Sequence, residues 1–425
     1  MKLARNFTGG AGQPKTKMRA GVAIGWLVVL GVGLYELGGL MLVLSVAGLV
    51  SIIGGHELGH FLMAKRAGMA VTDFFIGFGP VLWSAQIKET RYGVRMFLVG
   101  GYVKVPGMNW QQDVLDELEP ATYRRASTHK KVLFAGAGPA ANIVMAVLLL
   151  WVTVTVIGVG STSHIGVAKT LIWSGVESPA AKAGLRAGDR IVKVDGVYIN
   201  SANKLVSIIE SHAGSELRIV VERGDVWKSI RVFDTDARKI KVAGKYLASG
   251  SRPVGMIGVE LEYLRARSTV LGGLGVAVLQ VGRLIGDSSV GIVRVFSPSE
   301  FVSLAHQIFS NGPSPRGAAS RPMSMVGVIR VAVQGGDKGG VGVVLTILAG
   351  INVFVGLFNL IPLAPLDGGY IAGTIYERAR SRKGREHRAN PKWVGAGVYL
   401  FGIIMVAMLA GTLYLDIAHP IANPF

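Results

Sequence analysis

The main pattern of this chain is a series of long apolar stretches separated by polar segments. Four stretches reach about the 20 residues that an α-helix needs to cross a bilayer, and they lie at 40–63, 132–156, 340–361 and 394–415. A shorter apolar stretch at 20–35 follows three basic residues, and we predict a span there in preference to a signal-like segment. The pattern predicts a polytopic α-helical membrane protein with about five transmembrane helices.

Basic residues beside the spans predict their orientation. Lys and Arg are enriched in 1–19, 64–131 and 378–393, and cytoplasmic loops of membrane proteins carry an excess of these residues. All three segments lie on one side if the chain crosses the membrane five times. We therefore predict a cytoplasmic N-terminal arm, two cytoplasmic loops and a large extracytoplasmic middle section. The predicted membrane segments are 20–63 with two transmembrane helices, 132–160, 340–377, and 394–425 with the C-terminal helix and tail.

The segment 263–339 is predicted as a surface or amphipathic helical linker. Its apolar part, 269–296, carries Arg283, Asp287 and Arg294. Counting this part as a span would move the basic segment 378–393 to the other side of the membrane. We therefore expect its helices to lie on the membrane surface or to pack on the middle domain.

Residues 161–262 have the mixed composition of a small folded α+β domain. Short strands are predicted at 190–194, 216–222 and 226–233, and a helix at 202–212. Ser178 and Pro179 form an N-cap pair before a short helix. The stretch 178–196 resembles PDZ domains attached to bacterial envelope proteases, which bind chain ends by strand addition. The alternative is a spacer domain that only packs on the membrane portion.

Composition supports a membrane protein and limits its chemistry. Of 425 residues, 50% are hydrophobic and 17% charged, with a mean hydropathy of +0.45, which is too apolar for an ordinary soluble protein. Cysteine is absent, so any metal must be held by His, Asp or Glu. The formal net charge is +19, but the basic residues lie beside apolar stretches instead of along one basic domain. We therefore predict no nucleic-acid partner.

A His-Glu-x-x-His motif, His56-Glu57-Leu58-Gly59-His60, lies at the predicted cytoplasmic end of an apolar helix. Histidines four residues apart lie on one helical face and can bind the same zinc ion, and the adjacent Glu57 can polarise a metal-bound water. Ionisable side chains inside a membrane are costly unless they are paired or coordinated, so their clustering favours a functional site. The alternative is a polar helix end at the membrane interface.

A catalytic zinc ion requires a third protein ligand, and Asp367 is the best candidate. It follows another apolar stretch, and the predicted topology places it on the same side as His56 and His60. The alternative is that Asp367 only forms a turn with Gly368, as Asp-Gly pairs often do.

Taken together, these residues resemble the site-2 protease family of intramembrane zinc metalloproteases. The closest resemblance is to bacterial members of the regulator of sigma-E protease type, which carry a PDZ domain and cleave anti-sigma factors. The resemblance implies one Zn²⁺ per chain, Asp367 as the third ligand, and Asn359 as a residue that positions the substrate. Tyr370 departs from the pattern, since many relatives have His there. The segments that carry the resemblance are His56 to His60, Gly77-Phe78-Gly79-Pro80, Gly101-Tyr102-Val103-Lys104 with Pro106-Gly107, Gly138-Pro139 with Asn142, the PDZ-like insert, and Asn359 through Gly369.

Two strand-like runs, 81–87 and 92–99, surround a predicted turn at 89–91 in the cytoplasmic loop. In relatives, a membrane-associated β-hairpin at this place aligns the substrate as an added strand. This is physically reasonable because a helical span has its carbonyl groups in hydrogen bonds and must become extended before water attacks.

These predictions together describe regulated intramembrane proteolysis of single-span membrane proteins, anti-sigma factors among them. Glu57 is the expected general base, which takes a proton from the zinc-activated water and delivers it to the leaving amine. The expected location is the bacterial cytoplasmic (inner) membrane, within the lipid bilayer. The PDZ-like domain is expected on the extracytoplasmic side, where it excludes substrates that no earlier protease has shortened.

Three alternatives remain open at this stage. One is a membrane-anchored zinc protease of quality control that cuts in the cytosol. Another is an ion-binding transporter, since intramembrane His, Glu and Asp also mark ion paths, although no inverted repeat is evident. The third is a PDZ scaffold with a degenerate protease core, which would not need the complete set of His56, His60, Asp367 and Glu57.

Overall fold

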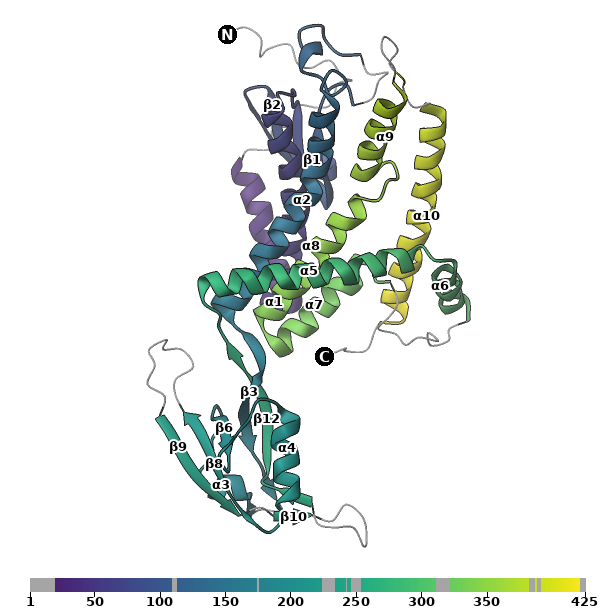
Figure 1. The fold of residues 1–425 in the computed structure, drawn as a ribbon. Coiled ribbons are helices and arrows are strands. Elements are labelled where there is room, and N and C mark those ends of the chain that lie inside the picture. Colours follow the sequence, from purple (N-terminus) through teal and green to yellow (C-terminus); the bar gives the residue numbers. More distant parts are fainter. Residues whose placement is uncertain are drawn as a thin grey trace. The chain divides into compact units, whose positions relative to one another are not determined.

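The structure is a computed structural model that divides into two compact units (Figure 1). It describes residues 20–108, 113–173, 176–223, 234–241, 243–245, 254–310, 322–381, 387 and 391–420. One unit comprises Met1–Trp151 and Leu274–Phe425, and the other comprises Val152–Gly273. The predicted arm 1–19, the predicted strand 226–233 and most of the basic segment after residue 381 lie outside the described residues.

Most described residues of the first unit are helical. Its helices are α1 (Ala20–Arg66), α2 (Thr128–Val152), α5 (Val270–Val295), α6 (Pro298–Ser310), α7 (Met325–Gly339), α8 (Val341–Asn359), α9 (Asp367–Arg380) and α10 (Pro391–Ala418). Helices long and apolar enough to cross a membrane occur at five places in the described chain, the predicted number. The set differs from the prediction, because the predicted spans 20–35 and 40–63 fall in one helix and α5 is the fifth candidate. They are Val28–Arg66, Thr128–Ile157, Val270–Val295, Val341–Asn359 and Gly395–Ala418.

Helix α1 contains two helical segments separated at Gly38 and Gly39. Both glycines have non-helical backbone angles, and Gly39 has φ of 66°, a left-handed conformation that glycine adopts without steric cost. The break falls between the predicted segments 20–35 and 40–63. The second segment carries the His-Glu-x-x-His motif.

Helix α5 differs from the prediction because it is one helix of 26 residues, long and apolar enough to be a span by itself. Its buried Ala277 and Val281 pack with Leu150 of α2 and Val353 of α8. Within this unit, α5 lies across α8 instead of alongside it (Figure 1). Because α5 also has the length and hydropathy of a span, its placement on the membrane surface stays a prediction.

The predicted segment 340–377 contains two helices, and the predicted span 340–361 corresponds to the first of them, α8. Helix α8 ends at Asn359, a turn follows, and α9 starts at Asp367. Pro362 and Pro365 lie in the turn, and proline disfavours a continuous helix because it lacks a backbone N–H and its ring clashes with the preceding turn. The break makes Asp367 the first residue of a new helix.

Strands β1 (Asp73–Ile87) and β2 (Thr90–Lys104) pair antiparallel and include the predicted runs 81–87 and 92–99. Phe75 is fully buried, and its ring stacks on Tyr102 with centroids 5.6 Å apart. A Cβ atom at Gly101 would lie 2.7 Å from Cγ of Glu57. The β2 backbone therefore lies directly against the helix that carries the motif.

The second unit is an antiparallel sheet with two helices, α3 (Pro179–Lys182) and α4 (Ala202–Ser211). The strand order is β12-β3-β6-β8-β9, with β7 paired to β6. Ser178 caps α3 by accepting a hydrogen bond from the Ala181 N–H, as predicted. Its strands, with two short pairs outside the main sheet, are β3 (Val159–Thr170), β4 (Ile172–Trp173), β5 (Val176–Glu177), β6 (Arg190–Val194), β7 (Val197–Tyr198), β8 (Glu216–Arg223), β9 (Asp234–Lys241), β10 (Ala243–Lys245), β11 (Val254–Met256) and β12 (Val259–Ala266).

Candidate metal centre

The predicted ligands His56, His60 and Asp367 converge on one point in the structure. His56 and His60 lie one turn apart on α1, and their Nε2 atoms are 3.2 Å apart. Asp367 Oδ2 lies 3.1 Å from His56 Nε2 and 3.3 Å from His60 Nε2. His56 is 9% exposed and His60 is 6% exposed. Three ligand atoms from two distant parts of the sequence therefore form a buried, nearly equilateral triangle.

The triangle has the dimensions of one face of a zinc coordination tetrahedron. Tetrahedral ligands about 2.0–2.1 Å from zinc lie roughly 3.3–3.4 Å from one another. Among the described residues, Asp367 Oδ2 is a buried oxygen that accepts no hydrogen bond, as expected of an atom reserved for a cation. The donor set of two imidazoles and one carboxylate is typical of catalytic zinc sites, so the residues present fit this metal.

A backbone carbonyl fixes the orientation of His60. Its Nδ1 lies 2.8 Å from the Phe134 carbonyl oxygen of α2. A carbonyl oxygen only accepts hydrogen bonds, so Nδ1 carries the proton and Nε2 presents its lone pair to the triangle. This arrangement behind a metal-binding histidine is common in zinc enzymes.

Asn142 of α2 is the corresponding neighbour of His56. Its side chain is fully buried, and Nδ2 lies 3.2 Å from His56 Nδ1. Oδ1 of Asn142 has no hydrogen-bond partner within the described chain. Exchanging the amide oxygen and nitrogen would let Oδ1 accept a hydrogen bond from Nδ1–H and leave Nε2 of His56 free to bind a metal.

Glu57 and Asn359 share a cavity of about 480 Å³ with the three presumed ligands. Glu57 follows His56 on α1, and Asn359 is the last residue of α8. One wall is formed by β2 and includes Val99, Gly101 and Tyr102. The cavity thus combines the metal site, a carboxylate and a strand.

Comparison with known proteins assigns the family. A sequence profile described as Peptidase family M50 matches residues 44–405, which is most of the chain. The chain belongs to peptidase family M50. This assignment confirms the resemblance to the site-2 protease family. Together with its membrane helices, it supports an integral membrane protein.

Relatives of this M50 chain are named as zinc metalloproteases. It is 28% identical over 408 residues to zinc metalloprotease Rip1 of Mycobacterium tuberculosis, covering 86% of this chain and 94% of that protein. It is also 28% identical over 414 residues to zinc metalloprotease Rip1 of Mycolicibacterium smegmatis, covering 91% and 98%. The family and these names support a zinc metalloprotease.

One solved structure aligns with a part of the M50 chain. It is the PDZ domain of an SdrC-like protein from Listeria monocytogenes, with 24% identity and a TM-score of 0.18. The alignment covers 23% of this chain and 87% of that chain.

The structure adds neighbours of this M50 site to which the sequence assigned no role. The Phe134 carbonyl and Asn142 hold the two histidines, and Gly138 lies against both imidazoles. Gly138 and Asn142 are four residues apart, so they share one face of α2. This spacing was visible in the sequence, but the partner of that face was not.

Replacing Gly138 with Ala is expected to lower the zinc affinity of this M50 chain by about 10–100-fold, the range for groups behind metal ligands. A Cβ atom at this position would collide with Nε2 of His60 and lie 2.7 Å from Nε2 of His56. The measurement is the zinc content of purified protein across a series of buffered zinc concentrations. The matched control is Gly136→Ala, because a Cβ there meets nothing within 4 Å. Equal zinc affinity in both variants would contradict the placement of Gly138 against the ligands.

Proposed function

We propose that this protein is an intramembrane zinc metalloprotease that cleaves single-span membrane proteins, with anti-sigma factors as a substrate class. The observation that supports it most is the convergence of His56, His60 and Asp367 beside Glu57 in one cavity of the helical unit. A site of this composition can hydrolyse a peptide bond, and the membrane helices around it favour substrates that are themselves in the membrane.

His56, His60 and Asp367 would hold one Zn²⁺ per chain. When bound, zinc supplies Lewis-acid polarisation of the scissile carbonyl and lowers the pKa of a bound water. Glu57 takes the proton from the attacking water and delivers it to the leaving amine nitrogen. His60 keeps its coordinating nitrogen free because Nδ1–H donates to the Phe134 carbonyl. Asn359 helps to position the substrate or its reacting carbonyl.

The β2 strand provides a means of opening a helical substrate. Backbone groups in an α-helix are hydrogen-bonded within the helix, so a scissile bond must be extended before attack. Residues 99–103 of β2 line the cavity next to Glu57, and an extended segment can pair with a strand edge. We infer that the β1–β2 hairpin associates with the membrane and aligns the substrate as an added strand.

We infer that the second unit selects which substrates reach the metal site. Its six-stranded sheet presents β12 as an edge strand, and α4 packs on β11 of the separate β10–β11 pair. PDZ domains bind chain ends by adding them as a strand to a sheet edge. We infer that this PDZ-like domain lies on the extracytoplasmic side of the bacterial cytoplasmic membrane and excludes substrates that have not been shortened.

The position of the cut tests this proposal. The full-length protein and a single-span substrate are co-reconstituted in vesicles, and the products are identified by mass spectrometry. We expect the cut within the substrate's apolar span or at its edge. Cuts confined to cytosolic loops would favour a membrane-anchored quality-control protease, and zinc flux without proteolysis would favour an ion-binding transporter.

A further inference from the structure

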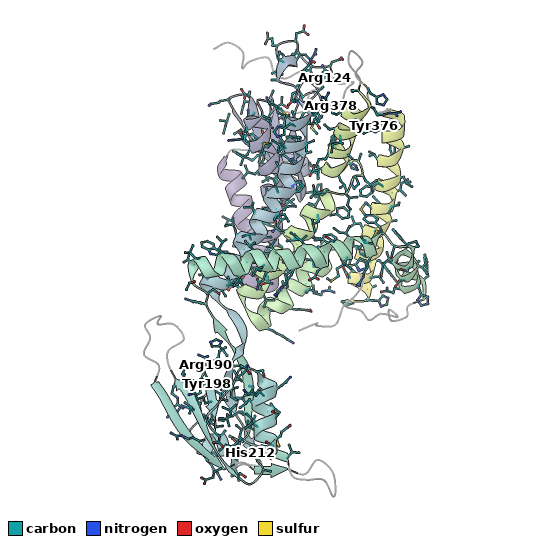
Figure 2. All side chains as sticks on the ribbon, viewed as in Figure 1. Arg124, Arg190, Tyr198, His212, Tyr376 and Arg378 are labelled. Atoms are coloured by element: carbon teal, nitrogen blue, oxygen red, sulfur yellow. The ribbon has the colours of Figure 1, made fainter. Side chains whose placement is uncertain are left out.

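A second cavity, of about 490 Å³, lies outside the metal site at the start of α2 and the end of α9. Figure 2 shows Arg124, Tyr376 and Arg378 at this end of the helical unit. The walls come from four segments, namely the loop before α2, the first turn of α2, the C-terminal half of α9, and Ser381 with His387 after α9. The charged side chains in its lining are Glu119, Arg124, Arg125, Lys131, Glu377 and Arg378.

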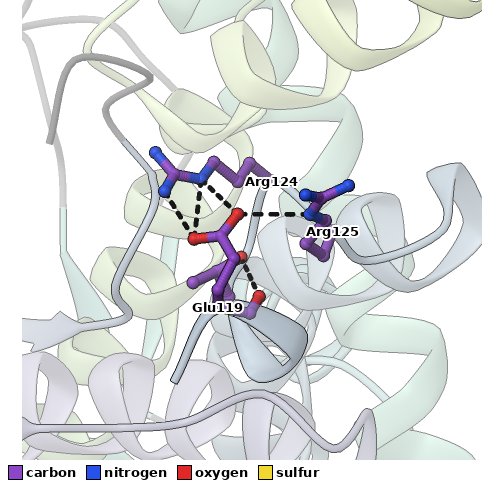
Figure 3. A network of polar contacts seen from close by, with 4 residues as sticks. Glu119, Arg124 and Arg125 are labelled. Carbon is purple, nitrogen blue, oxygen red and sulfur yellow. Dashed lines mark hydrogen bonds and ion pairs between the residues drawn. The ribbon is translucent and has the colours of Figure 1, made fainter. Parts of the chain in front are cut away.

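Two arginines in the lining of this cavity share one carboxylate (Figure 3). Arg124 Nε donates to Glu119 Oε1 at 2.9 Å, and Arg125 Nε donates to the same oxygen at 3.2 Å. The hydrogen bond from Arg124 lowers the pKa of Glu119, so this carboxylate stays charged and holds both guanidinium groups. Arg125 is 67% exposed, and its two terminal amino groups lie outside this ion pair.

The remaining walls add positive charge and hydroxyl groups. Lys131 is on α2 and Arg378 is on α9, and the polar residues Ser127 and Thr374 also line the cavity. The lining thus has four Lys or Arg side chains against two carboxylates. The first backbone N–H groups of the 25-residue helix α2 have no acceptor within the helix and add to the positive potential. The cavity therefore favours an anion.

The position of the cavity relative to the bilayer can be inferred from α2, because α2 begins a candidate span and its first residue lines the cavity. The candidate span Thr128–Ile157 begins at the cavity, so Ser127 and Lys131 lie near the expected membrane–water boundary. Tyr376 is 47% exposed on α9 beside Arg378, and tyrosine is enriched at this boundary. Phosphates of lipid headgroups lie at the same depth, and basic pockets between spans on the cytoplasmic side bind anionic headgroups.

We propose that this cavity binds a phosphate group, with the headgroup of an anionic phospholipid as its source. Arg125, Lys131 and Arg378 would contact the phosphate oxygens, while Glu119 keeps the arginines in place. Guanidinium and ammonium groups match phosphate because both donate charge-assisted hydrogen bonds. The bound lipid would link α2 to α9, the helix that begins with Asp367.

The test measures the unfolding temperature of the detergent-purified full-length chain during titration with dioctanoyl phosphatidylglycerol. A ligand that binds only the native state stabilises it by RT ln(1 + L/Kd), where L is the free ligand concentration, so this temperature rises with ligand concentration once the concentration exceeds Kd. Dioctanoyl phosphatidylcholine, which has no net charge, is the lipid control. Inorganic phosphate in a separate titration distinguishes a soluble source from a lipid source. We expect stabilisation by phosphatidylglycerol that grows with the logarithm of its concentration above Kd, weaker stabilisation by inorganic phosphate and none by phosphatidylcholine.

Substitutions connect the binding to this cavity. The variant Lys131→Gln with Arg378→Gln is expected to weaken phosphatidylglycerol binding at least about tenfold, because each change removes a hydrogen bond to a charged group. The matched control is Lys130→Gln with Arg380→Gln, which removes the same charge from the same two helices at exposed positions outside the lining. Equal affinity in the two double variants would overturn the proposal.

Two further measurements identify the ligand with the unaltered chain, so they do not depend on whether a variant folds. For the unaltered chain, we expect phosphatidylglycerol affinity to fall as NaCl rises, since the contact is ionic and exposed to solvent. Affinity independent of NaCl, or equal binding of phosphatidylcholine, would refute a phosphate site built from these cations. If inorganic phosphate binds as tightly as phosphatidylglycerol, the phosphate site stands and its source is a soluble anion instead of a lipid.

Discussion

Replacing Glu57 with Gln is expected to reduce peptide-bond cleavage by about 10²–10⁴-fold, the contribution of a well-placed general acid–base group. Glutamine has nearly the same shape as glutamate, but its amide cannot accept the water proton. His56, His60 and Asp367 are unchanged, so the variant should keep one zinc per chain. The measurements are cleavage of a co-reconstituted single-span substrate and the zinc content of the purified protein.

The matched control for this variant is Glu89→Gln. Glu89 is an exposed residue at the hairpin turn, where it pairs with Lys65, and it lies outside the cavity lining. We expect the control to cleave at the rate of the unaltered chain. If Glu57→Gln retains full activity, Glu57 is not the base and the proposed mechanism fails.

Replacing Asp367 with Asn is expected to remove both zinc and activity. The amide keeps the size of the side chain but loses the negative charge, and a neutral amide oxygen is a much weaker zinc ligand than a carboxylate. The two histidines alone leave the metal site incomplete. Zinc content after gel filtration should fall well below one per chain, and cleavage should fall at least as far as in the Glu57 variant.

The control for this second variant is Asp337→Asn, an exposed position at the end of α7. It should keep both zinc and activity, because it removes the same charge away from the site. Stoichiometric zinc in Asp367→Asn would show that the third ligand is another residue. The proposal that His56, His60 and Asp367 together hold the zinc ion would then be wrong.

Several parts of the site were predictable because they depend on local periodicity. Residues 56 and 60 are one helical turn apart, so their common face follows from helix geometry alone. Asp367 needed the topology argument and the family resemblance, since its partners are about 300 residues away in the sequence. The span 340–361 was predicted from its apolar pattern, but the separate helix α9 that starts at Asp367 was not, because its sequence is no longer apolar.

Other features could not be predicted because tertiary contacts decide them. The roles of Asn142 and the Phe134 carbonyl depend on how α2 packs on α1. The sequence of either helix alone does not determine this packing. The predicted runs are shorter than strands β1 and β2 because Gly77 and Gly101 interrupt the alternation of polar and apolar residues outside those runs. In the structure these glycines allow close backbone approaches instead.

The separation of the presumed ligands along the chain has a consequence for biosynthesis. Ribosomes add residues from the N-terminus, so His56 and His60 are made long before Asp367. The whole second unit is translated in between. On the proposed assignment, a nascent chain remains catalytically silent during insertion, and hydrolytic activity begins only when α9 docks against the finished bundle.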